Sequence, residues 1–365
     1  MQQQLETTLA QLVAVASVST SAESCHEAIE FVKNELAPLS LFIHSDTNLP
    51  NPWLIATTQD TKTPDILLAA HLDVVPAPNE LFFMKKEGDK LLGRGVYDMK
   101  FAATCYIELF KAHINELRQR NVGMLLTTDE ELGGHTVPNI LETGWRTKVV
   151  FIPDAGDNWQ IEKRAKGFYN FELKTFGKAT HGSRPWEGDN AIHRLEDALR
   201  ILKKAYPYSP APADTTLSVT MFEGGEAINQ IPAYASAKVD FRTFRVADIT
   251  ALKELLEELK TSHKLEITPV SFGPPIAFTA NAPEVASFLE TLKEITGKQA
   301  SFTESYGGTD ARYFVPYGIP YIAIEPLGGE RHSNAEWVNA VDLERYYQLI
   351  KNWVLKLPVT ANYLD

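Results

Sequence analysis

The chain has 365 residues, of which 35 are lysine or arginine and 47 are aspartate or glutamate, so its formal net charge at pH 7 is −12. Contents of 44% hydrophobic and 22% charged residues are ordinary for globular proteins and exclude disordered, collagen-like and coiled-coil classes. An acidic surface repels phosphate, and the sequence has no basic patch, so no nucleic-acid partner is expected.

The first part of the chain alternates helical and strand patterns. Apolar residues at helical spacing predict two helices before residue 40, and a further helix is expected at 101–117. Short apolar runs bounded by turn residues predict buried strands at 66–70, 122–126 and 149–152. Continuous apolar strands that alternate with helices are typical of a mostly parallel sheet sandwiched by helices.

From about Lys166 the pattern changes to β-α-β-β-α-β, which is the order of a ferredoxin-like unit. The expected strands are 168–176, 216–222, 233–244 and 264–270, and the expected helices are 191–205 and 249–259. A helix at 283–295 and a strand at 321–325 then resume the first pattern. We therefore predict an α/β catalytic metal-binding domain, residues 1–165 and 273–365, with an inserted α+β lid or dimerisation domain, residues 166–272.

The two cysteines, Cys25 and Cys105, form no C-x-x-C pair and are expected to be small buried hydrophobic residues. No uninterrupted apolar stretch of about 18 residues is present, and the first residues lack the pattern of a secretion signal. We therefore expect a soluble, cytoplasmic protein without a membrane partner.

Polar residues follow each predicted strand of the first domain. These segments are His71-Leu-Asp73, Asp129-Glu130-Glu131, Pro153-Asp154 and, after a Gly-Gly turn, His332. Ligands of open α/β sheets bind at the carboxyl ends of the strands, so these side chains are expected to converge.

The turn from Gly93 to Asp98 precedes a predicted helix. It lacks the third glycine of a dinucleotide fingerprint, and Asp98 would repel a pyrophosphate, so a metal-ligand role is favoured. Histidines and carboxylates without cysteine suit zinc, or else cobalt or manganese. Two such ions could be held by His71, Asp98, Glu131, Asp154 and His332, with Asp98 bridging them.

Catalysis also needs a proton acceptor that is not a ligand. Side chains of adjacent residues in an extended segment point in different directions, so Glu131 can bind metal while Glu130 activates a metal-bridging water. Asp73 lies two residues after His71 and is expected to hold the imidazole Nδ1–H.

Six motifs, taken as an ordered set, resemble one family. They are His71-x-Asp73-Val-Val-Pro76, Gly93-Arg-Gly-x-x-Asp98-x-Lys100, Asp129-Glu130-Glu131-x-Gly133, Asp154, Thr180-His181-Gly-Ser-x-Pro185 and His332-Ser-x-x-Glu336. The set resembles the co-catalytic dinuclear zinc peptidases that include aminoacylase-1, acetylornithine deacetylase, succinyl-diaminopimelate desuccinylase, carboxypeptidase G and cytosolic dipeptidases, and it spans essentially the whole chain. The resemblance implies a zinc-peptidase-like fold and a homodimer formed through the inserted domain.

The resemblance also implies how the metal ligands are divided. One zinc ion would be bound by His71, Asp98 and Asp154, and the other by Asp98, Glu131 and His332. Glu130 matches the general base of the family, and Asp73 matches the residue that orients the first histidine.

Further residues acquire roles from the same resemblance. His181 matches a histidine that in dimeric relatives reaches the partner's active site and stabilises the oxyanion. Asn229 and Arg242 resemble lid positions that bind substrate, and Gly308 and Thr309 belong to a segment that resembles the substrate-side loop. Local alternatives are a turn role for Asn229 and a surface ion pair of Arg242 with Asp240.

The family pattern leaves the substrate open. Aspartate at position 154 is typical of aminopeptidases and dipeptidases, whereas the compact lid resembles that of deacylases. We therefore predict a metal-dependent hydrolase of amide bonds in small substrates, either short peptides or N-acyl amino acids. The alternative is a catalytically inactive metal- or ligand-binding protein on the same fold. A serine hydrolase is not favoured, because Ser183 lacks the glycines of a nucleophile elbow.

Overall fold

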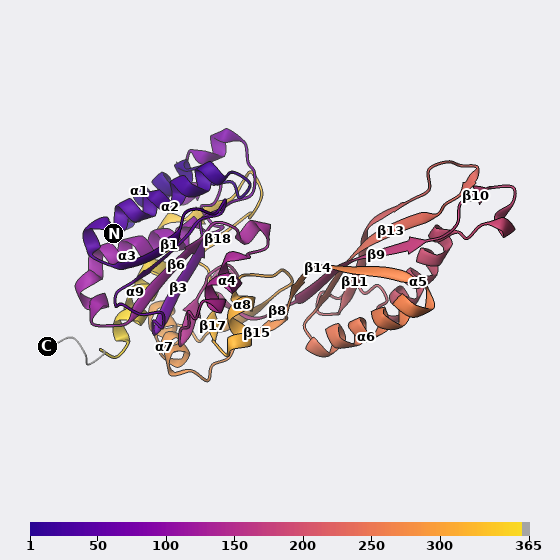
Figure 1. The fold of residues 1–365 in the computed structure, drawn as a ribbon. Helices are drawn as coiled ribbons and strands as arrows, with labels where there is room; N and C mark the ends of the chain where they lie inside the picture. Colours follow the sequence, from indigo (N-terminus) through magenta and orange to yellow (C-terminus); the bar gives the residue numbers. More distant parts are fainter. Residues whose placement is uncertain (360–365) are drawn as a thin grey trace. The chain divides into compact units, whose positions relative to one another are not determined.

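The protein is described by a computed structural model that covers residues 1–359; residues 360–365, the end of the predicted segment 273–365, lie outside the described residues. The chain forms two compact units (Figure 1). The first comprises Met1–Lys163, Phe278–Glu304 and the chain from Thr309 onward, and the second comprises Arg164–Ala277 and Ser305–Gly308. The predicted inserted domain, 166–272, lies within the second unit. Among residues 1–359, none of the helices has both the length and the apolar composition that crossing a membrane requires.

The first unit is built on a sheet with the strand order β1-β2-β6-β3-β7-β17. Strands β3 (Ile66–His71), β6 (Val122–Thr127), β7 (Val149–Phe151) and β17 (Tyr321–Ile322) run parallel. Strands β1 (Phe42–Asp46) and β2 (Trp53–Thr57) extend the sheet in the antiparallel direction. Both β3 and β6 are buried along their whole length, as continuous apolar runs require. The mostly parallel sheet is thus confirmed, and its antiparallel edge was not predicted.

Helices supply the rest of the first unit's core. They are α1 (Gln2–Ala14), α2 (Ala22–Leu36), α3 (Lys100–Arg118), α4 (Thr136–Glu142), α7 (Pro283–Thr296), α8 (Ala311–Phe314) and α9 (Ala340–Lys356). Helices α1, α3 and α9 pack on one another, and α3 also packs on β3. The rings of Phe151, Phe288 and Trp353 meet at centroid distances of 5.2–5.6 Å. Burial of each such side chain contributes roughly 1.5–3 kcal/mol. Cys25 and Cys105 are both buried, as expected.

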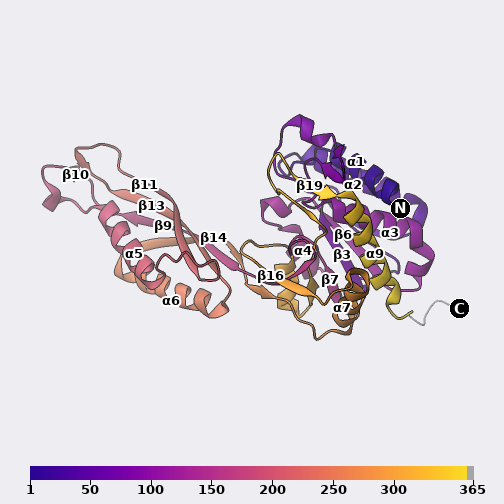
Figure 2. The same cartoon turned by 180° about the vertical axis from the view of Figure 1, so that it is seen from behind.

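Shorter strands form two further small sheets (Figure 2). Strands β4 (Lys85–Glu87), β5 (Lys90–Leu92), β18 (Gly328–Gly329) and β19 (Trp337–Asn339) form a small sheet in the order β18-β19-β5-β4. Strands β8 (Gln160–Ala165), β15 (Ile276–Ala277) and β16 (Ser301–Ser305) form another. The strand predicted at 321–325 corresponds to β17, which is shorter than expected because it ends at Ile322.

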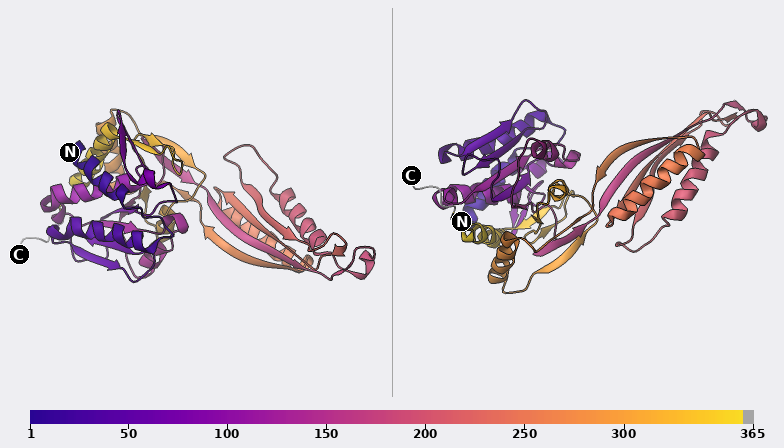
Figure 3. Two further views of the ribbon diagram at one scale, coloured as in Figure 1. Left: turned by 90° about the horizontal axis from the view of Figure 1, so that it is seen from above. Right: turned by 60° about the horizontal axis from the view of Figure 1, so that its bottom comes forward.

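The second unit has a four-stranded antiparallel sheet in the order β11-β13-β9-β14. Its strands are β9 (Gly167–Phe176), β11 (Thr216–Gly224), β13 (Tyr234–Thr243) and β14 (Leu265–Gly273). Helices α5 (Ala191–Ala205) and α6 (Val246–Ser262) lie side by side on one face (Figure 3). Burial alternates along β9, because one face packs on the helices and the other does not. The predicted ferredoxin-like unit is confirmed, and it carries an additional ribbon of β10 (Thr180–His181) and β12 (Gln230–Ile231).

Candidate active site

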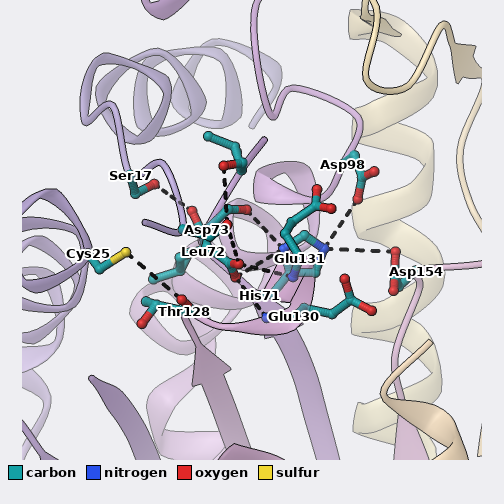
Figure 4. Close-up of polar contacts among 12 residues, drawn as sticks. Ser17, Cys25, His71, Leu72, Asp73, Asp98, Thr128, Glu130, Glu131 and Asp154 are labelled. Carbon is teal, nitrogen blue, oxygen red and sulfur yellow. Dashed lines mark hydrogen bonds and ion pairs between the residues drawn. The ribbon is translucent and has the colours of Figure 1, made fainter. Parts of the chain in front are cut away.

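The carboxyl ends of the parallel strands bring the predicted site residues of the first unit together. His71 is the last residue of β3, and Asp154 lies three residues after β7. Glu131 lies in a 3₁₀ turn (Glu130–Leu132) that follows β6, and Asp98 lies in the turn before α3. Figure 4 shows these side chains pointing toward one another, with Asp98 and Asp154 both joined to His71.

The ligand atoms fall into two groups that share Asp98. In one group, His71 Nε2 lies 3.2 Å from Asp98 Oδ1 and 3.8 Å from Asp154 Oδ1. In the other, His332 Nε2 lies 3.1 Å from Asp98 Oδ2 and 3.0 Å from Glu131 Oε1. Within each group the donor atoms lie within 4.8 Å of one another. These are the two sets that the family resemblance implies, and their role as metal ligands stays a prediction.

His71, His332 and Asp98 shift one another's pKa values strongly. Although burial opposes it, hydrogen bonds with His332 and His71 hold the pKa of Asp98 well below its usual value. The same carboxylate, together with Glu131, raises the pKa of His332 to about 10. Burial lowers the pKa of His71, but hydrogen bonds with Asp154, Asp73 and Asp98 outweigh it and raise the pKa well above its usual value. When no metal is bound, both shifts favour the protonated form of the histidines.

The donor set suits divalent metal ions. It offers imidazole nitrogen and carboxylate oxygen without thiolate, a combination typical of zinc, cobalt or manganese rather than of soft metals. An oxygen of Asp98 is available to each group, so two ions can share it.

Asp73 is buried beneath the site, and its carboxylate has a different main partner from the one predicted. Its Oδ1 and Oδ2 accept the backbone N–H groups of Glu130 and Glu131 at 3.3 and 3.1 Å, and Ser19 Oγ donates to Oδ2 at 2.8 Å. His71 Nδ1 lies closer to the Asp73 carbonyl oxygen, at 3.0 Å, than to its Oδ1, at 3.5 Å. Asp73 therefore fixes the turn that carries both glutamates, as well as facing the imidazole.

Glu130 belongs to neither ligand group. Its side chain is 13% exposed, and Arg312 Nη2 lies 3.8 Å from its Oε1. Burial, with the nearby charge of Asp154, raises the pKa of Glu130 well above its usual value in the metal-free protein. A carboxylate beside the ligands, but outside their groups, is placed as a general base requires.

Glu336 and Arg94 are supporting residues whose partners the sequence did not reveal. The Glu336 carboxylate accepts the backbone N–H groups of Gly95, Tyr97 and Asp98 at 2.9–3.1 Å, and Arg94 Nη1 lies 2.7 Å from it. Arg94 Nη2 also donates to the carbonyl oxygen of His332 at 3.2 Å. Both residues belong to the motifs, but their targets lie about 240 positions away in the sequence and only the fold identifies them.

The remaining predicted residues lie mainly in the second unit. His181 is exposed, its Nδ1 lies 2.7 Å from Ser183 Oγ, and the N–H of Gly182 donates to the carbonyl of Asn229 at 2.6 Å. The β10–β12 ribbon thus brings His181 and Asn229 together. Arg242 Nε donates to the Asp240 carboxylate at 3.0 Å, which is the local alternative considered above.

Two further predicted residues are neighbours at a boundary between the units. Gly308 is the last residue of the second unit's segment Ser305–Gly308, and Thr309 begins the first unit's next segment. Thr309 is buried, and its Oγ1 accepts the N–H of Ala311 at 3.0 Å, so it shapes the start of α8. A role of either residue in substrate binding stays a prediction.

The fold and the cluster of histidines and carboxylates are typical of hydrolases of the metallopeptidase type. The chain belongs to peptidase family M20/M25/M40, whose model matches residues 67–356. A peptidase M20 domain-containing protein of Schizosaccharomyces pombe is 27% identical over 259 residues, which are 67% of this chain and 62% of that protein. The chain thus covers less than two thirds of that relative. A succinyl-diaminopimelate desuccinylase of Rickettsia akari is 26% identical over 322 residues, 80% of this chain and 84% of that enzyme.

Solved structures share the fold over nearly the whole chain. A tripeptidase from Staphylococcus aureus matches with a TM-score of 0.78 and 20% identity, covering 98% of this chain and 99% of that one. A dinuclear metal-binding M20 peptidase from Bacillus subtilis matches with a TM-score of 0.71 and 16% identity, covering 97% and 98%. These similarities establish the M20 peptidase fold.

Proposed function

We propose that this member of the M20 hydrolases is a dinuclear metalloenzyme that cleaves an amide bond in a small substrate. The observation that carries the proposal is the pair of ligand groups that share Asp98, with Glu130 beside them but in neither group. We assign one ion to His71, Asp98 and Asp154 and the other to Asp98, Glu131 and His332. Zinc is the proposed metal, and cobalt or manganese suit the same donors.

The chain's own residues carry the proton transfers. When bound, two divalent ions would lower the pKa of a water molecule and polarise the substrate carbonyl. Glu130 accepts a proton from the attacking water and delivers it to the leaving nitrogen as the C–N bond breaks. Asp73 keeps Glu130 in place by accepting the backbone N–H groups of its turn.

We propose two substrate classes, each supported by a different observation. The aspartate at position 154 and the fold shared with a tripeptidase favour short peptides with a free amino terminus. The sequence relationship to a succinyl-diaminopimelate desuccinylase favours N-acyl amino acids. In either class the substrate carboxylate would be bound by Asn229, Arg242 and the segment at Gly308 and Thr309.

We further propose a homodimer in which His181 serves the active site and stabilises the oxyanion. Strands β11 and β14 are the edges of the second unit's sheet, so each offers backbone groups to another chain. A dimeric mass in size-exclusion chromatography with light scattering supports the assembly. A monomeric mass with full activity contradicts a role for His181 in the partner's site.

The experiment that tests the function combines activity with metal analysis. The purified chain, loaded with zinc, cobalt or manganese, is assayed on dipeptides, tripeptides, N-acetyl and N-succinyl amino acids. The Glu130→Ala variant should lose turnover and keep two metals. The control Glu142→Ala, at an exposed position, should keep its turnover and its two metals. Turnover by Glu130→Ala, or loss of its metal, would refute the assigned roles. A metal-loaded protein inactive on every substrate would favour the alternative of a binding protein.

A further inference from the structure

A second segment contacts the backbone that follows the turn carrying Glu130. Tyr313 Oη donates to the carbonyl oxygen of Gly133 at 2.7 Å. Gly134 has φ +64°, and a Cβ atom there would collide with the Asp310 carboxylate. The start of α8 is therefore packed directly on the backbone of this turn, although the two segments lie about 180 residues apart in the sequence.

Arg312, on the same segment, brings a positive charge to Glu130. Its side chain is 6% exposed, and its Nη2 lies 3.8 Å from Glu130 Oε1. Asp310 and Asp154 lie close enough to Glu130 for their negative charges to act on its carboxylate. A glutamate side chain has three rotatable bonds, and like charges on nearby carboxylates push it out of position unless a cation opposes them.

We propose that Arg312 is a positioning residue that holds the Glu130 carboxylate toward the reacting water. The proposal rests on the proposed function, because it takes Glu130 as the general base. Arg312 is itself buried, so it acts through Glu130 and is not expected to touch the substrate. A planar guanidinium keeps its direction better than the flexible ammonium of lysine, and we expect arginine to be superior here.

The test is a set of kinetic constants measured on the metal-loaded enzyme. Because general-base catalysis contributes roughly 10²–10⁴-fold, misplacing the base should lower kcat by about 30-fold in Arg312→Gln, with KM changed less than about twofold. Arg312→Lys should recover kcat to within about fivefold of the parent, since it restores the charge with poorer geometry. Two metals should remain bound in both variants. The control Arg200→Gln, at an arginine whose side chain is 75% exposed in the second unit, should match the parent.

Repeating the Arg312 substitution in a Glu130→Asp variant distinguishes positioning of the carboxylate from a general structural role of Arg312. In Glu130→Asp the carboxylate is one methylene shorter and lies farther from the guanidinium, so adding Arg312→Gln should lower kcat by less than about threefold. An equal loss in both backgrounds, a loss confined to KM, or loss of metal would overturn the proposal. If Arg312→Gln does not fold, Arg312→Lys takes its place. Its loss of kcat, up to about fivefold in the parent, should then vanish in the Glu130→Asp background.

The outcomes also distinguish this proposal from the proposed function. An inactive Glu130→Ala that keeps two metals, together with a fully active Arg312→Gln, refutes only the role of Arg312. An active Glu130→Ala refutes the assignment of the base itself.

Discussion

Replacing Glu336 by glutamine should damage both the stability of the first unit and the candidate metal centre. The carboxylate is 2% exposed, lies 2.7 Å from Arg94 Nη1 and accepts the N–H groups of Gly95, Tyr97 and Asp98. Glutamine keeps the size of the side chain but removes its charge. Its amide also presents N–H groups to donors that need an acceptor.

The expected magnitude follows from the buried ion pair. Removing one partner of such a pair leaves an uncompensated charge and typically lowers stability by about 3–5 kcal/mol. Arg94 also donates to the carbonyl oxygen of His332, so the change disturbs residues of both ligand groups. Loss of a residue that orients metal ligands typically weakens metal binding roughly 10–100-fold.

Urea unfolding of the metal-free protein and competition with a chromogenic zinc chelator measure the two effects separately. Glu330→Gln is the matched control, because Glu330 lies on the same loop as His332 but is exposed. It should change the free energy of unfolding by no more than about 0.5 kcal/mol. If Glu336→Gln resembles this control in both measurements, the reasoning from the buried pair is wrong.

Three other predictions concern metal, pH and backbone geometry. A chelator should abolish turnover, and zinc, cobalt or manganese should restore it; full activity in the metal-free protein contradicts the proposed chemistry. Because His71 and His332 have raised pKa values and must lose their protons to bind metal, apparent affinity should rise with pH, by up to about two log units per pH unit near neutrality. Calorimetry in buffers of different ionisation heats should count about two protons released, and pH-independent affinity contradicts the assignment. Gly134→Ala should lower the free energy of unfolding by about 1–3 kcal/mol more than Gly297→Ala does, because Gly297 has a similar φ but open space around it. Equal losses of the two variants in urea unfolding would exclude the packing of Gly134 against Asp310.

The long elements were predictable because their hydrophobic patterns are unambiguous. The helix predicted at 191–205 is α5 with the same bounds, since its apolar face and its Asn190 cap are both local features. Strands β1 and β10 were not predicted. The side chains of β1 are largely exposed, and β10 is a two-residue strand, so both are defined by backbone pairing rather than by burial.

The site was predictable to the extent that it depends on strand ends. Parallel strands deliver their carboxyl ends to one edge, so His71 and Asp154 had to meet. The supporting contacts could not be inferred in the same way. Lys100, for example, is fully buried and donates to the carbonyl oxygens of Leu12 and Val15, and no local pattern specifies such partners. A sequence motif therefore identifies which residues support the site, but the groups that they contact are known only from the fold.

The acidic excess of the chain gains a partial explanation from the site. The formal count of −12 takes every carboxylate as charged and every histidine as neutral, so two bound divalent ions would bring it to about −8. Metal binding must displace protons from the imidazole nitrogens of His71 and His332, so metal loading changes the net charge by less than the four charges of two divalent ions. In the proposed enzyme the local effect would be larger than the net one, because the cations would lie beside the bound substrate. An acidic protein can therefore still attract a substrate carboxylate to its active site.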